Sequence, residues 1–275
     1  MKEEHFVGTL SKTTKPRLNL IDIQCGTQSI CVLMDTGAPT SRINKHTAKT
    51  LNLPIEQDGD YDYAVIPKIT IGPFQWENLR VSINPHEDKS SIYHGRQTDG
   101  IFGCDVMNGL CWIFEPTMRK FHVCTPNHSF FSKWTEGAGC TSIHPHKLAD
   151  LPSNVWATEC FLNGQGPIHT DLDTGAQRTI LTSKAGAFLD PTAAREEIRL
   201  SNGGTERNVG SYRTTAEEIT IAGVRFLKPV VAVCDPIFSV APELLSKPAI
   251  LLGIDVIGES RYAFDLHHGE FWIHP

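Results

Sequence analysis

The sequence lacks long apolar segments and clusters of basic residues. No apolar run approaches the roughly 20 residues that a membrane-spanning helix requires. The net charge is −6, with 31 acidic against 25 basic residues, which argues against nucleic acid or an anionic membrane as the main partner. Residues 1–5 contain no apolar signal region. We therefore expect a cytoplasmic protein, with export after removal of a leader as the alternative.

The sequence also lacks the motifs of several enzyme classes. It has no Gly-x-Ser-x-Gly turn, no phosphate-binding glycine loop and no dinucleotide-binding fingerprint. His-Glu-x-x-His is absent, and neither His144-Pro145-His146 nor His267-His268 has acidic or thiol partners at helical spacing. We therefore expect these histidines in exposed loops, and we expect neither a metal nor another cofactor.

The eight cysteines show no Cys-x-x-Cys pair and no zinc-like spacing. A chain of 275 residues with 40% hydrophobic content can build a core without disulfide bonds. Buried free thiols are therefore the preferred interpretation. A bridge such as Cys124–Cys140 remains open for an exported protein.

What the sequence does contain is a repeated tetrapeptide that follows an apolar run in each half. A strand ending in Asp-Thr-Gly offers a carboxylate at its end, a hydroxyl beside it and a glycine for a sharp turn. One copy would be weak evidence, because these residues are common in turns. The two copies are Asp35-Thr36-Gly37-Ala38 and Asp173-Thr174-Gly175-Ala176.

Two aspartates can carry out acid–base chemistry together. Carboxylates within hydrogen-bond distance share a proton and titrate as a pair. The ionised member can accept a proton from a water, and the protonated member can donate to the oxygen of a carbonyl under attack. Asp35 and Asp173 could therefore hydrolyse an amide with no covalent intermediate and no metal. The alternative is two ordinary hairpin turns of similar sequence.

The two copies belong to a longer internal repeat. An offset of 138 residues relates Asp35 to Asp173, and an offset of 150 relates Ile101-Phe102-Gly103 to Leu251-Leu252-Gly253. Matching blocks keep their order along the chain, which indicates two homologous halves of one fold. The second half gains 12 residues within the segment 189–218, where a Gly-rich turn predicts a longer hairpin.

These motifs resemble those of the aspartic peptidases of the pepsin and retropepsin group, whose lobes each have an Asp-Thr/Ser-Gly loop and a later apolar-apolar-Gly element. Ala38 and Ala176 are more similar to retropepsins, which are dimers of one-motif chains. The resemblance implies a mostly-β, bilobal acid-protease fold, with two β-barrel-like lobes and the active site between them. It implies a monomer with an N-terminal lobe over 1–124, an interlobe connection over 125–154 and a C-terminal lobe over 155–275.

The resemblance also assigns roles to the repeated residues. Asp35 and Asp173 would be the catalytic dyad, and the two threonines would hydrogen-bond across the lobe interface. The glycines would allow close approach of the backbone to water and substrate. The residues expected to support the active-site loops are Thr36, Gly37, Ala38, Thr174, Gly175 and Ala176.

The family closes its cleft with a β-hairpin flap, and the length comparison places the better candidate at about residues 197–215. Within it, Ser201, Asn202, Gly203 and Gly204 would contact substrate, or would belong to a hairpin without that role. Asp105 and Asp255 follow the apolar-apolar-Gly elements, where the family uses carboxylates structurally. Arg178 either pairs with a carboxylate or is solvated.

Local patterns predict several elements. We expect a strand at 5–10, a hairpin over 17–34 and a strand pair over 66–84. A short helix is expected at 44–51, with Asn44 as its N-cap. A polar loop over 84–98 then leads to the first apolar-apolar-Gly element.

The sequence thus predicts an aspartic endopeptidase that binds peptide or protein substrates in extended form. Two alternatives stay open: a catalytically silent peptide-binding module of the same fold, and a protease restricted to itself or one partner. Ala38 and Ala176 remove hydroxyls that could stabilise ionised dyad carboxylates. We therefore expect a pH optimum above that of a pepsin, at about 5–6.5.

Overall fold

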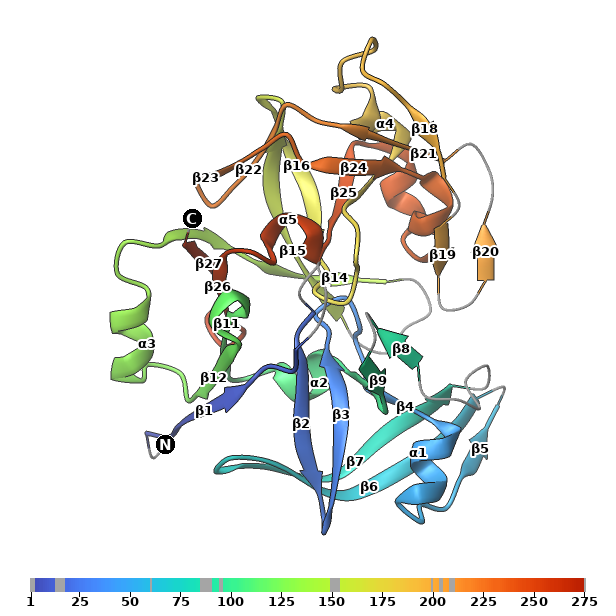
Figure 1. The fold of residues 1–275 in the computed structure, drawn as a ribbon, viewed down its shortest axis with the longest axis vertical. Helices are drawn as coiled ribbons and strands as arrows, with labels where there is room; N and C mark the ends of the chain where they lie inside the picture. Colours follow the sequence, from blue (N-terminus) through green and yellow to red (C-terminus); the bar gives the residue numbers. More distant parts are fainter. Residues whose placement is uncertain are drawn as a thin grey trace.

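The computed structural model is mostly β, which confirms the predicted fold class. It describes residues 3–12, 18–59, 61–84, 91–93, 96–148, 154–198, 200–202, 205–207 and 211–274. In this described part of the chain, the large sheets are one from the first half, one from the second half and one shared by both (Figure 1).

The first-half sheet is closed on itself, because β2 pairs with β6 as well as with β3. At its centre, a short strand runs parallel to β3 and carries the first apolar-apolar-Gly element. In spatial order, the strands are β2 (Leu20–Cys25), β3 (Gln28–Met34), β10 (Gly100–Phe102), β4 (Arg42–Asn44), β7 (Phe74–Asn84), β6 (Tyr61–Ile71) and β5 (Glu56–Asp58).

The second-half sheet repeats this plan with more and shorter strands. In spatial order, they are β18 (Glu196–Glu197), β21 (Tyr212–Thr215), β24 (Val230–Val233), β17 (Ile180–Leu181), β25 (Ala249–Leu252), β16 (Gln165–Leu172), β15 (Asn154–Leu162), β22 (Glu218–Ile221) and β23 (Val224–Leu227). A further strand, β14 (His144–Lys147), pairs with β15.

The shared sheet takes strands from both halves, on the left of Figure 1. In spatial order, they are β1 (His5–Thr9), β12 (Lys120–Cys124), β11 (Cys111–Glu115), β26 (Arg261–Asp265), β27 (Glu270–His274) and β13 (Gly139–Ser142). Because β11 pairs antiparallel with β26, backbone hydrogen bonds join the two halves. Division of the chain between the halves would therefore cut through a sheet.

The helices are short and lie at the ends of strands. The α-helices are α1 (Lys45–Thr50), α2 (Cys104–Met107), α3 (Ser129–Trp134), α4 (Ser183–Gly186) and α5 (Ile254–Ile257), and the 3₁₀ helices are η1 (Pro116–Met118), η2 (Asp235–Val240) and η3 (Pro242–Ser246). Among the residues that the structure describes, no helix is both long and apolar enough to cross a membrane.

The internal repeat is visible in the order of the elements. The segment α2–β11–β12 recurs 150 residues later as α5–β26–β27. The long strands β6 and β7 correspond to β21–β22 and β23–β24, each interrupted once in the second half. The extra residues of the second half lie between β18 and β21 and contain a hairpin, β19 (Leu200–Asn202) with β20 (Thr205–Arg207).

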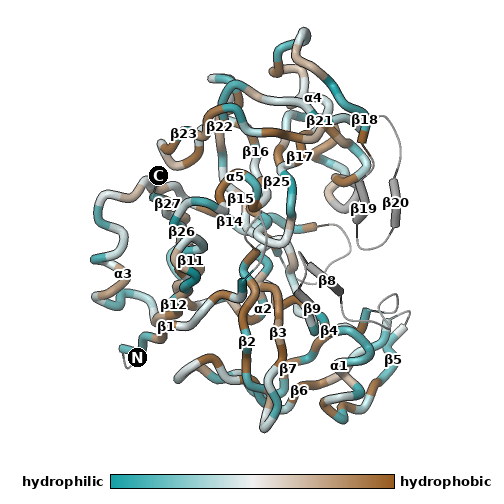
Figure 2. Tube along the Cα trace, in the orientation of Figure 1, coloured by the Kyte–Doolittle hydropathy of each residue, from teal (hydrophilic) through white to brown (hydrophobic). Residues whose placement is uncertain are grey.

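Local sequence explains the elements nearest to the first Asp-Thr-Gly. In β3, residues 30–34 are apolar and buried without alternation, as expected for a central strand covered on both faces. Figure 2 shows this hydrophobic character along β2 and β3, in contrast to the hydrophilic edge strand β5. The predicted helix is present as α1, where the Asn44 side chain accepts a hydrogen bond from the Thr47 N–H at 2.7 Å.

Two connecting segments contain regular secondary structure. The region expected to be a polar loop contains a short hairpin, β8 (Ser91–Tyr93) with β9 (Arg96–Thr98). The connection over 125–154 contains α3, β13 and β14, and β13 completes the shared sheet by pairing with β27. The sequence of this connection shows no periodic pattern, and β27, from the far end of the chain, supplies the backbone hydrogen bonds of β13.

All eight cysteines are free thiols, and seven of them are buried. Cys124 lies opposite Cys111 in the β11–β12 register, whereas Cys140 is exposed on β13 and pairs with Trp272. The arrangement therefore gives no support to a Cys124–Cys140 bridge.

A buried side-chain pair links the shared sheet to the first half and provides a test of this architecture. Tyr262 of β26 donates its hydroxyl proton to Asn19 Oδ1 at 3.0 Å and accepts from Asn19 Nδ2 at 2.8 Å. Both residues are fully buried.

Tyr262→Phe should destabilise the protein by about 1–3 kcal/mol, because it leaves both Asn19 groups without this partner. Tyr61→Phe, at a position that is 66% exposed, is the control. Urea unfolding measures both, and equal free energies for Tyr262→Phe and wild type would contradict the prediction.

Candidate active site

Both Asp-Thr-Gly loops follow a central strand and are held by a parallel neighbour. Asp35 follows β3, and its N–H donates to the Phe102 carbonyl of β10 at 2.9 Å. Asp173 follows β16, and its N–H donates to the Leu252 carbonyl of β25 at 3.0 Å. The apolar-apolar-Gly elements recognised in the sequence therefore fix the backbone of each aspartate.

The two threonines join the loops through reciprocal hydrogen bonds. The Thr36 hydroxyl donates to the Leu172 carbonyl at 2.7 Å, and the Thr174 hydroxyl donates to the Met34 carbonyl at 2.9 Å. Each hydroxyl also accepts from the other threonine's N–H at 3.1 Å. Because both threonines are fully buried, these bonds are shielded from water and hold the loops in fixed register.

The glycines are required by close packing of the loops. A Cβ at Gly37 would lie 2.3 Å from Asp173 Cγ, and a Cβ at Gly175 would lie 2.3 Å from Asp35 Oδ2. Neither glycine has a positive φ, so the constraint is space and not backbone conformation. Each glycine therefore lies directly against the opposite carboxyl group, and the two aspartates face each other.

The electrostatics of the aspartates follow from this proximity. Asp35 is 8% exposed and Asp173 is half-buried. Burial, the charge of Asp35 and a hydrogen bond to Asp35 raise the pKa of Asp173 well above its ordinary value. Hydrogen bonds to Asp173 Oδ1 from the N–H groups of Gly175, at 2.9 Å, and Ala176, at 2.8 Å, act in the opposite direction but do not outweigh them. Asp173 therefore keeps its proton to a higher pH than an ordinary aspartate does.

Asp105 and Asp255 lie in α2 and α5, directly after the two apolar-apolar-Gly elements. Asp105 accepts from the Ser41 hydroxyl at 2.6 Å, and Asp255 accepts from the Thr179 hydroxyl at 2.8 Å. The same hydroxyls accept from Gly103 N–H and Gly253 N–H. Burial raises the pKa of both carboxyls. The two aspartates thus brace the apolar-apolar-Gly elements, as the resemblance implies.

Arg178 is exposed, and its positive charge lowers the pKa of Asp255 against the larger effect of burial. The candidate flap residues are described only in part. Ser201 and Asn202 belong to β19, which pairs with β20, whereas Gly203 and Gly204 lie outside the described residues. A contact with substrate stays a prediction for this hairpin.

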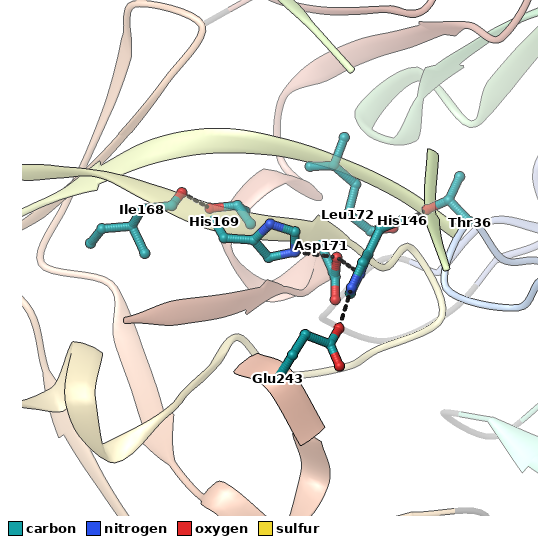
Figure 3. A network of polar contacts seen from close by, with 8 residues as sticks. Thr36, His146, Ile168, His169, Asp171, Leu172 and Glu243 are labelled. Carbon is teal, nitrogen blue, oxygen red and sulfur yellow. Dashed lines mark hydrogen bonds and ion pairs between the residues drawn. The ribbon is translucent and has the colours of Figure 1, made fainter. Parts of the chain in front are cut away.

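A second polar cluster, which the sequence did not predict, lies on the strand that leads to Asp173. His146 Nδ1 lies 2.8 Å from Asp171 Oδ1, and His169 Nε2 lies 3.0 Å from the same oxygen (Figure 3). His146 Nε2 also lies 2.9 Å from Glu243 Oε1. Hydrogen bonds to Asp171 and Glu243 raise the pKa of His146.

This cluster corrects the expectation that the histidine pairs lie in exposed loops. His144, His267 and His268 are exposed, but His146 belongs to β14 and its side chain is only 12% exposed. The repeat contained a signal, because Asp171 occupies the position of the buried Leu33, 138 residues earlier. A charged residue in one copy of a repeat, at a position that is buried and apolar in the other copy, indicates that further polar side chains lie against it.

Comparison with known proteins adds information on the second half. Residues 158–256 match a protein-family model described as "Aspartyl protease", which supports an aspartic protease family for this chain. The matched segment contains the second Asp-Thr-Gly and the second apolar-apolar-Gly element. No similar sequence is found among curated proteins.

Among solved structures, the chain is similar to a retropepsin-like aspartic protease from Rickettsia conorii. The two are 11% identical, with a TM-score of 0.33, over 45% of this chain and 92% of that chain.

The threonine hydrogen bonds can be tested with a matched pair of variants. Thr36→Val keeps the shape but removes the hydroxyl, so that the Leu172 carbonyl and the Thr174 N–H lose a buried partner. Unfolding in urea should show a loss of about 1–3 kcal/mol for Thr36→Val. Thr36→Ser keeps the hydroxyl and should lie closer to wild type. Equal stability of the Val and Ser variants would show that the hydroxyl is unimportant.

Proposed function

We propose that the protein is an aspartic endopeptidase whose dyad consists of Asp35 and Asp173. The observation that carries this proposal is the reciprocal packing of each glycine against the opposite aspartate, which brings two carboxyls from equivalent loops face to face. A pair of turns without this role has no need of two carboxyls in contact, one buried and one half-buried, which is energetically costly.

In the proposed mechanism, the dyad activates a water. The Asp35 carboxylate accepts a proton as the water oxygen attacks the peptide carbonyl, and Asp173 donates its proton to the carbonyl oxygen. This transfer gives a neutral tetrahedral diol. As the diol collapses, Asp173 takes a proton from one of its hydroxyls, and Asp35 gives the proton that it took from water to the departing amine, so the dyad is regenerated and no acyl-enzyme forms.

We further propose that one chain forms the complete site. Lobes over 1–124 and 155–275 would supply one aspartate each, and the connection over 125–154 would join them. The pairing of β11 with β26 supports this arrangement, because it ties the two halves into a single unit. The substrate would be an extended peptide whose backbone forms strand-like hydrogen bonds. The hairpin β19–β20, inserted only in the second half, is the candidate flap over it.

The catalytic assignment is tested by peptide cleavage. A diverse peptide mixture is incubated from pH 3 to 8 with wild type, Asp173→Asn and Asp58→Asn, which makes the same chemical change on the exposed edge strand β5. Wild type and Asp58→Asn should cleave, and Asp173→Asn should lose activity by at least a factor of about 100, because its amide cannot exchange the proton. Equal cleavage by Asp173→Asn and wild type would refute the assignment.

The pH profile tests the protonation state. Because the pKa of Asp173 is raised, the shared proton should persist into mildly acidic conditions, and activity should fall as pH rises and both carboxyls ionise. We expect an optimum at about pH 5–6.5. Ala38→Ser and Ala176→Ser add hydroxyls that can donate to ionised carboxylates, and should move the optimum to lower pH. A wild-type optimum below about pH 3.5 would contradict this expectation.

A further inference from the structure

Three side chains with metal-ligating atoms converge on the strand that precedes Asp173. His169 and Asp171 are two residues apart on β16, so both point to the same face of the sheet. His146 reaches them from β14, across the intervening strand β15. The small Ala157, which pairs with both Asp171 and His144, lies between the outer strands and leaves room for the longer side chains to meet.

The ligand atoms already lie close together. One atom from each of His146, His169 and Asp171 lies within 4.8 Å of the other two, and two of the separations are 2.8 and 3.0 Å. Figure 3 shows both rings directed at the Asp171 carboxyl. The three side chains are 11–15% exposed, so the cluster is shielded and yet reachable by a small ion.

The polar contacts of His146 require a positive charge in this cluster. Both nitrogens of the His146 ring face carboxylate oxygens, Nε2 at 2.9 Å from Glu243 Oε1 and Nδ1 at 2.8 Å from Asp171 Oδ1. A neutral ring has one N–H and can donate to only one of these oxygens. The other contact brings two electron pairs together and requires a positive charge between them, either a second proton on the ring or a metal ion.

We propose that His146, His169 and Asp171 bind a divalent transition-metal ion of the zinc class. Two imidazoles and one carboxylate match the ligand preferences of zinc, at distances of about 2.0–2.2 Å that small side-chain movements would reach. Glu243 would hold the His146 ring through its other nitrogen, as carboxylates commonly do for metal-bound histidines. A water molecule would complete a tetrahedral shell.

The position of this site indicates a supporting role and not a direct part in peptide hydrolysis. Leu172 lies between Asp171 and Asp173, and its carbonyl accepts a hydrogen bond from the Thr36 hydroxyl. An ion bound here would cross-link β14 to β16 and fix the strand that carries both that carbonyl and the second aspartate. The first half has Cys31 and Leu33 at the equivalent positions, so it lacks this His-Asp pair.

The test is calorimetric titration of Zn²⁺ into untagged protein. Wild type should bind one equivalent at micromolar or lower dissociation constant, His146→Gln and His169→Gln should weaken binding at least tenfold, and Glu243→Gln about tenfold. His144→Gln, which removes an exposed histidine on the same strand, should match wild type. Binding that is equal in wild type, His146→Gln and His169→Gln would overturn the proposal, as would no binding by wild type.

Two further measurements separate ligand loss from misfolding and from the proposed protease activity. Circular dichroism should give equal spectra for wild type and variants without metal, and Zn²⁺ should raise the melting temperature of wild type and His144→Gln but not of His169→Gln. Bound Co²⁺ should give visible absorption with wild type and His144→Gln but not with His169→Gln. Asp35→Asn should bind Zn²⁺ like wild type. Absence of peptide cleavage would therefore not contradict the metal site, and absence of Zn²⁺ binding would not contradict the proposed protease activity.

Discussion

The reciprocal hydrogen bonds between Thr36 and Thr174 determine how the two halves meet. Each threonine hydroxyl donates to the strand that carries the opposite aspartate and accepts from the opposite loop backbone. With neither side chain exposed, no water can substitute for a lost partner. The space between each glycine and the facing carboxyl is so small that an added Cβ would overlap with that carboxyl. A change in the register of the two loops would therefore disturb this contact. The geometry of the carboxyl pair is thus a property of the interface and not of either loop alone.

The near-symmetry of this interface contrasts with asymmetry elsewhere. The elements that hold the aspartates, β3 with β10 and β16 with β25, are equivalent in the two halves. The elements that differ include β8–β9 in the first half, where the second half has η2 and η3, and the hairpin β19–β20, which lies among the residues that only the second half contains. Such a division is expected if the central framework is constrained by the carboxyl pair, while the outer segments are free to determine what approaches it.

Much of this fold could be predicted from the sequence, for identifiable reasons. The apolar run of β3 and the Asn44 cap depend on residues near one another in the chain, and each corresponds to an observed element. The repeat offsets come from a comparison of the two halves, and the order of the elements follows them. The strands β13 and β14 could not be predicted, because their short sequences, one rich in small residues and the other polar with a proline, form strands only by pairing with β27 and β15. Likewise, the aspartates could be identified by a repeated motif, whereas the histidine cluster assembles from β14, β16 and η3 and has no local pattern.

The histidine cluster also bears on the energetics of the second half. Asp171 is buried to the same degree as Asp35, at 8% exposure, in a position that the first half fills with leucine. Replacement of a buried leucine by a charged residue is costly unless partners compensate. Here the compensation comes from His146 of the connection and His169 of β16, which both contact Asp171, and Glu243 of η3 contacts the other side of the His146 ring. The strand that presents Asp173 is therefore anchored by a network that the strand presenting Asp35 does not have. Because the two loops are coupled through the threonines, anything that strengthens or weakens this network acts on both aspartates.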